Sequence, residues 1–135
     1  MLTRTGGYAL HAALAIAEMG ADGRSVRAHE IAEALDLPGN YLAKILHSLS
    51  RTGLLVSERG RHGGFRLARD PAEIRLIEVV AGFDALGRER QCLLGRGTCS
   101  DAGGCPAHRE WKEASAPAFR FFETRTLADL MRSPR

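Results

Sequence analysis

Residues 31–46 read IAEALDLPGNYLAKIL, and in them two short amphipathic segments flank a proline. Pro38 disfavours the helical conformation in the residue before it, so a first helix is expected to end near Asp36. A second helix is then expected to start at Gly39 or Asn40. Apolar residues recur at helical spacing on both sides of the proline. They are Ile31, Ala32 and Leu35 before it, and Leu42, Ile45, Leu46 and Leu49 after it. Two short helices joined by a tight turn are typical of a helix-turn-helix unit.

The residues after this unit change to the pattern of a β-hairpin. Segments 54–57 and 65–67 are predicted strands, and the three glycines between them allow the backbone angles of a hairpin tip. Gly53 is expected to close the helix before it. A hairpin that follows a helix-turn-helix is typical of a winged helix. Residues 39–69 carry six cations against one anion, a local net charge of +5, whereas the whole chain carries +3. Such a concentration of positive charge favours binding to nucleic-acid phosphates.

The winged-helix prediction names candidate DNA contacts. The first residues of a recognition helix meet base edges in the major groove, so Asn40, Tyr41 and Lys44 are the candidates there. Arg59 and Arg61 at the hairpin tip are expected in or beside the minor groove, where narrow A·T-rich stretches attract guanidinium groups. Each helical candidate also has a structural interpretation, as a helix cap, a packing residue and a solvated charge respectively. A helix-turn-helix that docks on another protein is a further alternative, but it leaves the basic wing without a clear use.

Further helices are predicted on both sides of the winged helix. One covers residues 8–19, and Ser25 is the predicted N-cap of the first helix of the helix-turn-helix. Asp70 and Pro71 are expected to open another helix. Its apolar stripe consists of Leu76, Val79, Val80 and Phe83.

A final helix is expected from about Ala107. Its apolar face consists of Trp111, Ser115, Ala118, Phe119 and Phe122. Pro117 is expected to kink or restart this helix, because proline lacks an N–H and clashes with the preceding turn. Thr126 and Asp129 together predict a capping box for a last short turn, residues 127–131.

Three cysteines, Cys92, Cys99 and Cys105, lie in an irregular, glycine-rich stretch, and His108 follows the last of them. An odd number of crowded cysteines suits a metal or redox site in a reducing compartment better than a disulfide framework. Three thiolates and one imidazole can hold a zinc ion or an iron–sulphur cluster, and the absence of a closely spaced cysteine pair favours the cluster. His11 is the rival fourth ligand, reaching the cluster of a partner subunit. Three unligated thiols, one of them an oxidation sensor, are the remaining alternative.

Composition excludes several classes of protein. With 135 residues, 44% apolar and 26% charged, the chain is sized for one small globular domain, and wholesale disorder is excluded. No run approaches the roughly 20 apolar residues that span a bilayer, and the N-terminus lacks the features of a signal peptide. We therefore expect a cytoplasmic protein that does not contact a membrane. A thiol oxidoreductase is the alternative from another class, but neither a Cys-X-X-Cys pair nor a nucleotide-binding motif is present, so we expect no enzyme activity.

Together these segments resemble the IscR/NsrR family of bacterial winged-helix transcription regulators. The resemblance covers nearly the whole chain, from Tyr8-Ala9-Leu10 to Thr126-Leu127-Ala128-Asp129-Leu130. Its most specific motif is the glycine-rich wing, Gly63-Gly64-Phe65-Arg66-Leu67-Ala68, followed by the three-cysteine set. Other matching segments are His29-Glu30-Ile31-Ala32, Tyr41-Leu42, Ile45-Leu46 and Gly53-Leu54-Leu55.

The resemblance implies a homodimer that binds double-stranded DNA at a palindromic operator and holds an iron–sulphur cluster. Such a cluster senses iron–sulphur status, nitric oxide or redox state. Cys92, Cys99 and Cys105 match the family's ligand cysteines, and His108 matches the histidine that completes a 2Fe-2S site. Other branches use a 4Fe-4S cluster or a ligand from the first helix of the partner subunit. The full set of candidate DNA contacts is Thr3, Arg4, Asn40, Tyr41, Lys44, Arg59, Arg61, His62 and Gly63.

The predicted fold is mainly α-helical with a small β-hairpin: a winged helix-turn-helix domain and a long C-terminal dimerisation helix. We expect a DNA-binding domain over 1–70, a connecting helix over 71–84, a cysteine-rich cluster-binding loop over 85–106, and the dimerisation helix with a C-terminal turn over 107–135. Our functional hypothesis is a dimeric repressor whose operator binding is controlled by the cluster, with 2Fe-2S favoured over 4Fe-4S. The alternative is a winged-helix regulator with a thiol redox switch or structural zinc instead.

Overall fold

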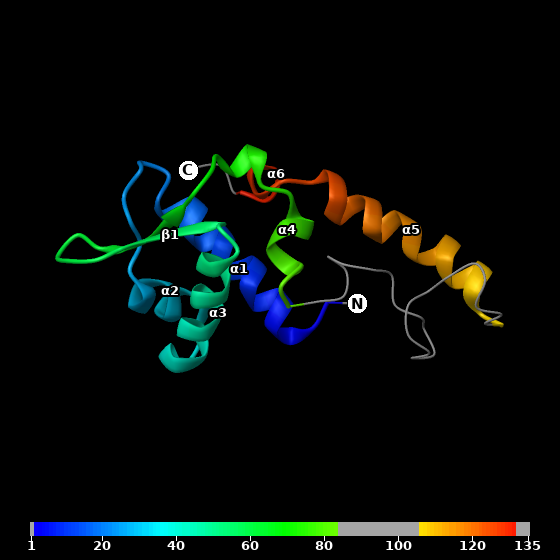
Figure 1. Ribbon diagram of the computed structural model, residues 1–135, viewed down its shortest axis with the longest axis horizontal. Coiled ribbons are helices and arrows are strands. Elements are labelled where there is room, and N and C mark those ends of the chain that lie inside the picture. The colour runs from blue at the N-terminus through cyan, green and yellow to red at the C-terminus, as the bar shows by residue number, and fades with distance from the viewer. Residues whose placement is uncertain (1, 84–105, 132–135) are drawn as a thin grey trace.

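The computed structural model describes residues 2–83 and 106–131, whose arrangement is shown in Figure 1. The elements in chain order are α1 (Arg4–Met19), α2 (Ala28–Leu35), α3 (Gly39–Arg51), β1 (Leu55–Glu58), β2 (Gly64–Leu67), the 3-10 turn η1 (Pro71–Glu73), α4 (Leu76–Val80), α5 (His108–Thr124) and α6 (Leu127–Leu130). The predicted fold, mainly helical with one antiparallel hairpin, is confirmed.

The core is built around α1, which starts earlier than the predicted residue 8. Its buried face consists largely of alanines, with Ile16 as the one large side chain. Small side chains let neighbouring elements approach closely, and α1 touches α2, α3, α4, α6 and β2. Burying each larger apolar side chain of these partners stabilises the fold by about 1.5–3 kcal/mol.

The turn of the helix-turn-helix forms where the sequence predicts it. Asp36 ends α2 in a left-handed conformation, with φ of 52°, and Pro38 is the N-cap of α3. The apolar stripe of α3 is buried as predicted. It consists of Leu42, Ile45, Leu46 and Leu49. Thr52 caps the C-terminal end of α3, and Gly53 follows with φ of 84°, a conformation that favours glycine.

The hairpin of β1 and β2, with the turn between them, forms the wing (residues 55–67). Its register runs from Leu55 opposite Leu67 to Glu58 opposite Gly64. Val26, just before α2, pairs with β2: its N–H donates to the Phe65 carbonyl at 2.8 Å and its carbonyl accepts from the Phe65 N–H at 2.7 Å.

This pairing shows that the prediction of Ser25 as an N-cap is wrong. The backbone is extended through Val26, so α2 starts later and Arg27 is its N-cap. The Ser25 hydroxyl instead donates to the Glu58 carboxylate in β1, at 2.8 Å.

The segment after the wing also differs from the predicted single helix. Asp70 accepts from the Ala72 N–H at 2.8 Å and caps η1, but Ile74 is extended and separates η1 from α4. The Ile74 carbonyl accepts from the Leu127 N–H at 2.9 Å, and this bond joins the C-terminal segment to the extended backbone at Ile74. Leu127 is fully buried in the core, and the predicted capping box at the start of α6 is confirmed.

Helix α5 projects from the rest of the chain, as Figure 1 shows. Of the two predicted effects of Pro117, a kink or a restart, the restart is wrong, because α5 continues through this residue from His108 to Thr124. The missing proline N–H removes one backbone donor, and the long helix retains the bonds on either side. Within α5, Ser115 alone is buried; its hydroxyl donates to the Trp111 carbonyl at 2.7 Å. None of the helices in residues 2–83 and 106–131 is long and apolar enough to cross a membrane.

Candidate nucleic-acid interface

One face of α3 is exposed along the length of the helix. Asn40, Lys44, His47 and Arg51 are all exposed and follow one another at intervals of three or four residues, so they share one side. We call these four residues the α3 stripe. Two of them, Asn40 and Lys44, are among the predicted contacts. The other two, His47 and Arg51, are not among the predicted contacts, although their helical spacing from Lys44 is a signal that could have added them.

Tyr41 takes a different position from its neighbours on α3. It is half-buried, its hydroxyl lies 2.8 Å from that of Thr5, and its ring meets that of Tyr8 edge-on with centroids 5.8 Å apart. These contacts tie the start of α3 to the start of α1. The structure therefore favours the packing interpretation of Tyr41 over a base contact.

The start of α1 carries two further predicted contacts. The Thr3 hydroxyl accepts from the Gly6 N–H at 3.0 Å and caps the helix, and Arg4 is exposed. Because Thr5 is bonded to Tyr41, this end of α1 lies next to the N-terminal end of α3. Thr3 and Arg4 are thus placed on the same side of the domain as the first residues of the α3 stripe.

The tip of the wing presents Arg59, Arg61 and His62, all exposed. Gly63 behaves differently, because it is buried and its N–H donates to the Gly60 carbonyl at 3.0 Å. A side chain at Gly63 would overlap the Glu58 carbonyl oxygen. Gly63 therefore shapes the tip of the wing, and the side chains of its neighbours project from this tip.

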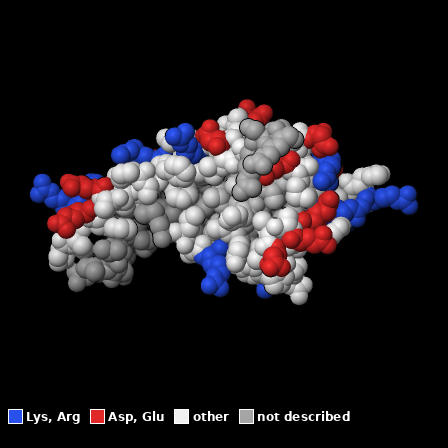
Figure 2. All heavy atoms as spheres, turned by 180° about the vertical axis from the view of Figure 1, so that it is seen from behind, with Lys and Arg blue, Asp and Glu red and all other residues white. Residues whose placement is uncertain are grey.

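Ion pairs separate the arginines of this region into two groups. Arg24 pairs with Glu30 at 3.4 Å, Arg66 with Glu58 at 2.6 Å, and both Arg69 and Arg75 pair with Glu78, at 2.7 and 3.8 Å. Within the described part of the winged helix, the remaining cations form no ion pair. They are Arg4, Arg27, Lys44, Arg51, Arg59 and Arg61. Basic side chains project at the right-hand end of Figure 2, where the wing lies.

The carboxylates that take part in these pairs are held in their charged form. A hydrogen bond from Arg66, helped by the Ser25 hydroxyl, lowers the pKa of Glu58. The backbone N–H of Arg27, helped by Arg24, lowers the pKa of Glu30. Both carboxylates therefore stay ionised and bound to their arginines at neutral pH.

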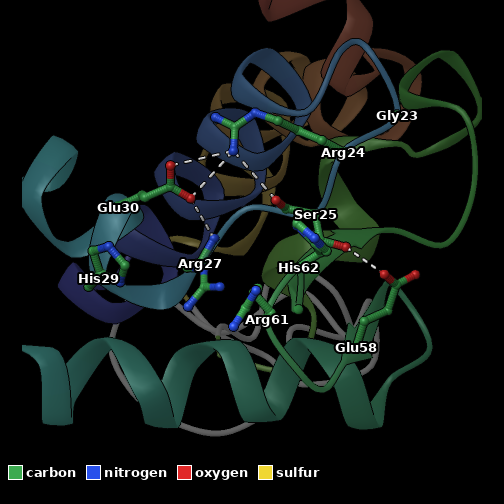
Figure 3. A pocket seen from close by; sticks show the side chains of 10 residues that line it. Gly23, Arg24, Ser25, Arg27, His29, Glu30, Glu58, Arg61 and His62 are labelled. Carbon is green, nitrogen blue, oxygen red and sulfur yellow. Dashed lines mark hydrogen bonds and ion pairs between the residues drawn. The ribbon is translucent and has the colours of Figure 1, made fainter.

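A pocket of about 670 Å³ lies between the N-terminal end of α2 and the wing. Figure 3 shows Arg27 from α2 and Arg61 from the wing pointing into the same region, with His62 beside them. The sequence prediction missed Arg27, because it precedes the recognition helix by twelve residues. No local signal shows that the Val26–Phe65 pairing brings it to the wing.

The predicted metal ligands lie mostly outside the described residues. Cys92, Cys99 and Cys105 fall in the segment that the structure leaves undescribed. His108 is half-buried at the first position of α5, and His11 is exposed on α1. Among residues 2–83 and 106–131, no group of three histidine, cysteine or acidic side chains is placed to hold a metal ion.

Comparisons with known proteins agree on the kind of protein. The Rrf2 family, described as iron-dependent transcriptional regulators, matches residues 2–133. The chain is 31% identical over 131 residues to the HTH-type transcriptional regulator IscR of Vibrio campbellii, covering 97% of this chain and 77% of that protein. It is 33% identical over 131 residues to IscR of Photobacterium profundum, covering 97% and 75%. CymR, the global cysteine regulator of B. subtilis, has the same fold, with a TM-score of 0.80 at 23% identity over 96% of this chain and 95% of that chain.

Proposed function

The chain belongs to the Rrf2 family of transcriptional regulators, and we propose that it is a dimeric DNA-binding regulator whose operator binding is controlled by an iron–sulphur cluster. The family assignment makes it a transcriptional regulator. We propose the cluster, the palindromic operator and the residues that bind each of them.

DNA binding is supported by the cations of the described winged helix that form no ion pair. Lys44 and Arg51 on the α3 stripe, with Arg59 and Arg61 on the wing, can each meet a phosphate or base without giving up a carboxylate partner. Binding to phosphates releases counterions from DNA, so affinity should fall steeply with salt. Asn40 at the start of α3 is the side chain best suited to read a base edge, and adenine is the base that an asparagine pairs with in two hydrogen bonds.

Dimerisation is supported by the apolar side chains of α5. Phe121 is 44% exposed, and it meets Phe122 edge-on with ring centroids 5.6 Å apart. A second copy of the chain that packs along α5 would remove this surface from water. Two winged helices related by a two-fold axis would then present their α3 stripes to half-sites about 34 Å apart.

Cluster binding is supported by the chemistry of the donor set. Cys92, Cys99 and Cys105 supply thiolates and His108 an imidazole, which are the ligands that iron–sulphur clusters take in proteins. A bound cluster would supply a centre sensitive to oxidants and to iron supply. His11 is the rival to His108, from the α1 helix of a partner subunit.

The elements on either side of the cysteine segment suggest how its state reaches the DNA-binding surface. Before it lies α4, whose Leu76 and Val79 are buried in the core beside α1. After it lies α5, which packs against α4, and Thr126, just beyond the end of α5, bridges to Arg75 at the start of α4. Binding of the three cysteines and His108 to one cluster would fix α5, and therefore the partner, relative to the α3 stripe.

Anaerobic reconstitution with iron and sulphide tests the cluster. We expect a coloured protein with visible absorption and stoichiometric iron and sulphide, both lost when any of the three cysteines is changed to serine. His108→Ala is expected to change the spectrum, whereas His11→Ala would do so if His11 is the ligand. A colourless protein without iron would overturn the cluster proposal. Bound zinc, or a reversible thiol titration, would then favour the alternative regulators.

A further inference from the structure

The α2–wing pocket carries an inference that rests on the proposed DNA binding. Arg27 and Arg61 come from segments 34 residues apart and both point into this pocket in Figure 3. Both are exposed, and neither guanidinium has an ion-pair partner among the described residues. Two positive side chains that face one space repel each other, so their placement favours an anion between them.

The carboxylates that line the same pocket are already neutralised. Glu30 is bound by Arg24 at 3.4 Å and by the Arg27 backbone N–H at 2.8 Å. Glu58 is bound by Arg66 at 2.6 Å and by the Ser25 hydroxyl at 2.8 Å. Both glutamates are thus occupied, and neither forms an ion pair with Arg27 or Arg61.

The charge of the pocket suits an anion. Its lining contains three arginines and two glutamates, and because Glu30 is bound by Arg24 and Glu58 by Arg66 outside this lining, Arg27 and Arg61 are left without a carboxylate partner. A phosphodiester group carries one negative charge, and planar guanidinium groups can each donate two hydrogen bonds to its oxygens. His29 and His62 on the rim add ring nitrogens that can also donate.

We propose that Arg27 and Arg61 together hold one backbone phosphate of the bound DNA. The pocket lies between the wing and the helix-turn-helix, so a duplex lying on both would pass its backbone across the pocket opening. The fixed Val26–Phe65 pairing, with bonds of 2.8 and 2.7 Å, sets the distance between α2 and the wing. Binding of the phosphate by both arginines therefore depends on the packing of the wing against the start of α2.

The test measures the salt dependence of binding to a random-sequence duplex of about 30 base pairs. Phosphate contacts carry no sequence information, so this probe does not require the operator. The variants are Arg27→Gln, Arg61→Gln and their combination, which remove charge and keep polar side chains. Arg24→Gln is the matched control, because Arg24 lines the same pocket with its guanidinium already bound to Glu30. Circular dichroism and thermal melting verify that each variant is folded.

We expect the slope of log affinity against log salt to become shallower by about 0.9 per bound subunit in the double variant, with part of that change in each single variant. The two single losses of affinity should be less than additive, because both side chains hold one phosphate. An unchanged slope in the double variant, or an equal change in Arg24→Gln, would overturn the site.

Two other outcomes are distinguishable. Wild-type protein that shows no salt-dependent binding to duplex DNA would overturn the proposed function itself, before any variant is compared. Inorganic phosphate, added at matched ionic strength, tests whether the bound phosphate comes from DNA. If it raises the melting temperature of the wild type but not of the double variant, and the salt slopes of DNA binding are equal in the two proteins, the phosphate does not come from DNA. In that case the pocket holds a free anion.

Discussion

Changing Tyr41 to phenylalanine separates a packing role from a DNA contact. The substitution keeps the ring, and with it the edge-on contact to Tyr8, but removes the hydroxyl that lies 2.8 Å from the Thr5 hydroxyl. If Tyr41 joins α3 to α1, the loss should appear in stability. If it reads a base, the loss should appear in DNA affinity.

The magnitude follows from the one hydrogen bond removed. A hydrogen bond within a folded protein contributes about 0.5–1.5 kcal/mol, and this one is partly buried, so we expect a loss near 1 kcal/mol in the free energy of unfolding. With a urea m-value of about 1–3 kcal/mol/M, the unfolding midpoint should fall by about 0.3–1 M. The edge-on contact of Tyr41 with Tyr8 should be retained.

The assay is urea unfolding of wild type, Tyr41→Phe, Thr5→Val and the double variant, at one protein concentration because dimer stability depends on it. The double variant should be little less stable than either single variant, since both remove the same bond. Affinity of Tyr41→Phe for duplex DNA should stay within about twofold of wild type. A loss of tenfold or more in DNA affinity, with unchanged unfolding midpoints, would refute the packing interpretation.

Three further predictions address stability. Leu127→Ala should lower the free energy of unfolding, measured by urea unfolding, by about 2–5 kcal/mol, because this fully buried side chain packs α6 against the core. A loss below about 1 kcal/mol would contradict that role. Gly64→Ala should destabilise the wing by about 1–3 kcal/mol, because φ is 145° and a side chain would overlap the Val26 carbonyl, whereas Gly7→Ala, in open space on α1, should be neutral or stabilising. Although desolvation raises the pKa of Glu78, hydrogen bonds from the Arg75 N–H and from Arg69 lower it below 4.5 overall. The contribution of ionised Glu78 to the stability of the fold is therefore present above pH 4.5 and lost as the pH falls through the lowered pKa. Glu78→Gln should therefore cost up to about 1 kcal/mol at pH 7, and the difference in stability from wild type should shrink as the pH falls through the lowered pKa of Glu78; a difference that stays constant on acidification would contradict the pairing.

Local signals were sufficient for the elements that make the fold. Pro38 marks the boundary between α2 and α3 because it restricts the residue before it, and the capping box at Thr126 forms because both of its partners lie within one turn. The exposed side of α3 follows from the buried stripe. These features depend on residues close together in the chain, so the sequence alone was enough to predict them.

Features that depend on distant pairing were not predictable in the same way. Ser25 has the chemistry of an N-cap, but the pairing of Val26 with Phe65 keeps the chain extended past it. The same pairing brings Arg27 to the wing. Ile74 interrupts the helix predicted after Pro71 because its carbonyl bonds with the C-terminal segment. In each case a long-range hydrogen bond overrides a local preference.

Control by an iron–sulphur cluster is measured as the DNA affinity of one protein preparation with and without its cluster. A duplex recovered by genomic footprinting would be titrated anaerobically with reconstituted protein, and again after the cluster is removed and the thiols are kept reduced. We predict affinities that differ by at least about tenfold, with protection of two half-sites about 34 Å apart. Equal affinities of the fully loaded and cluster-free proteins for this duplex would contradict control by an iron–sulphur cluster.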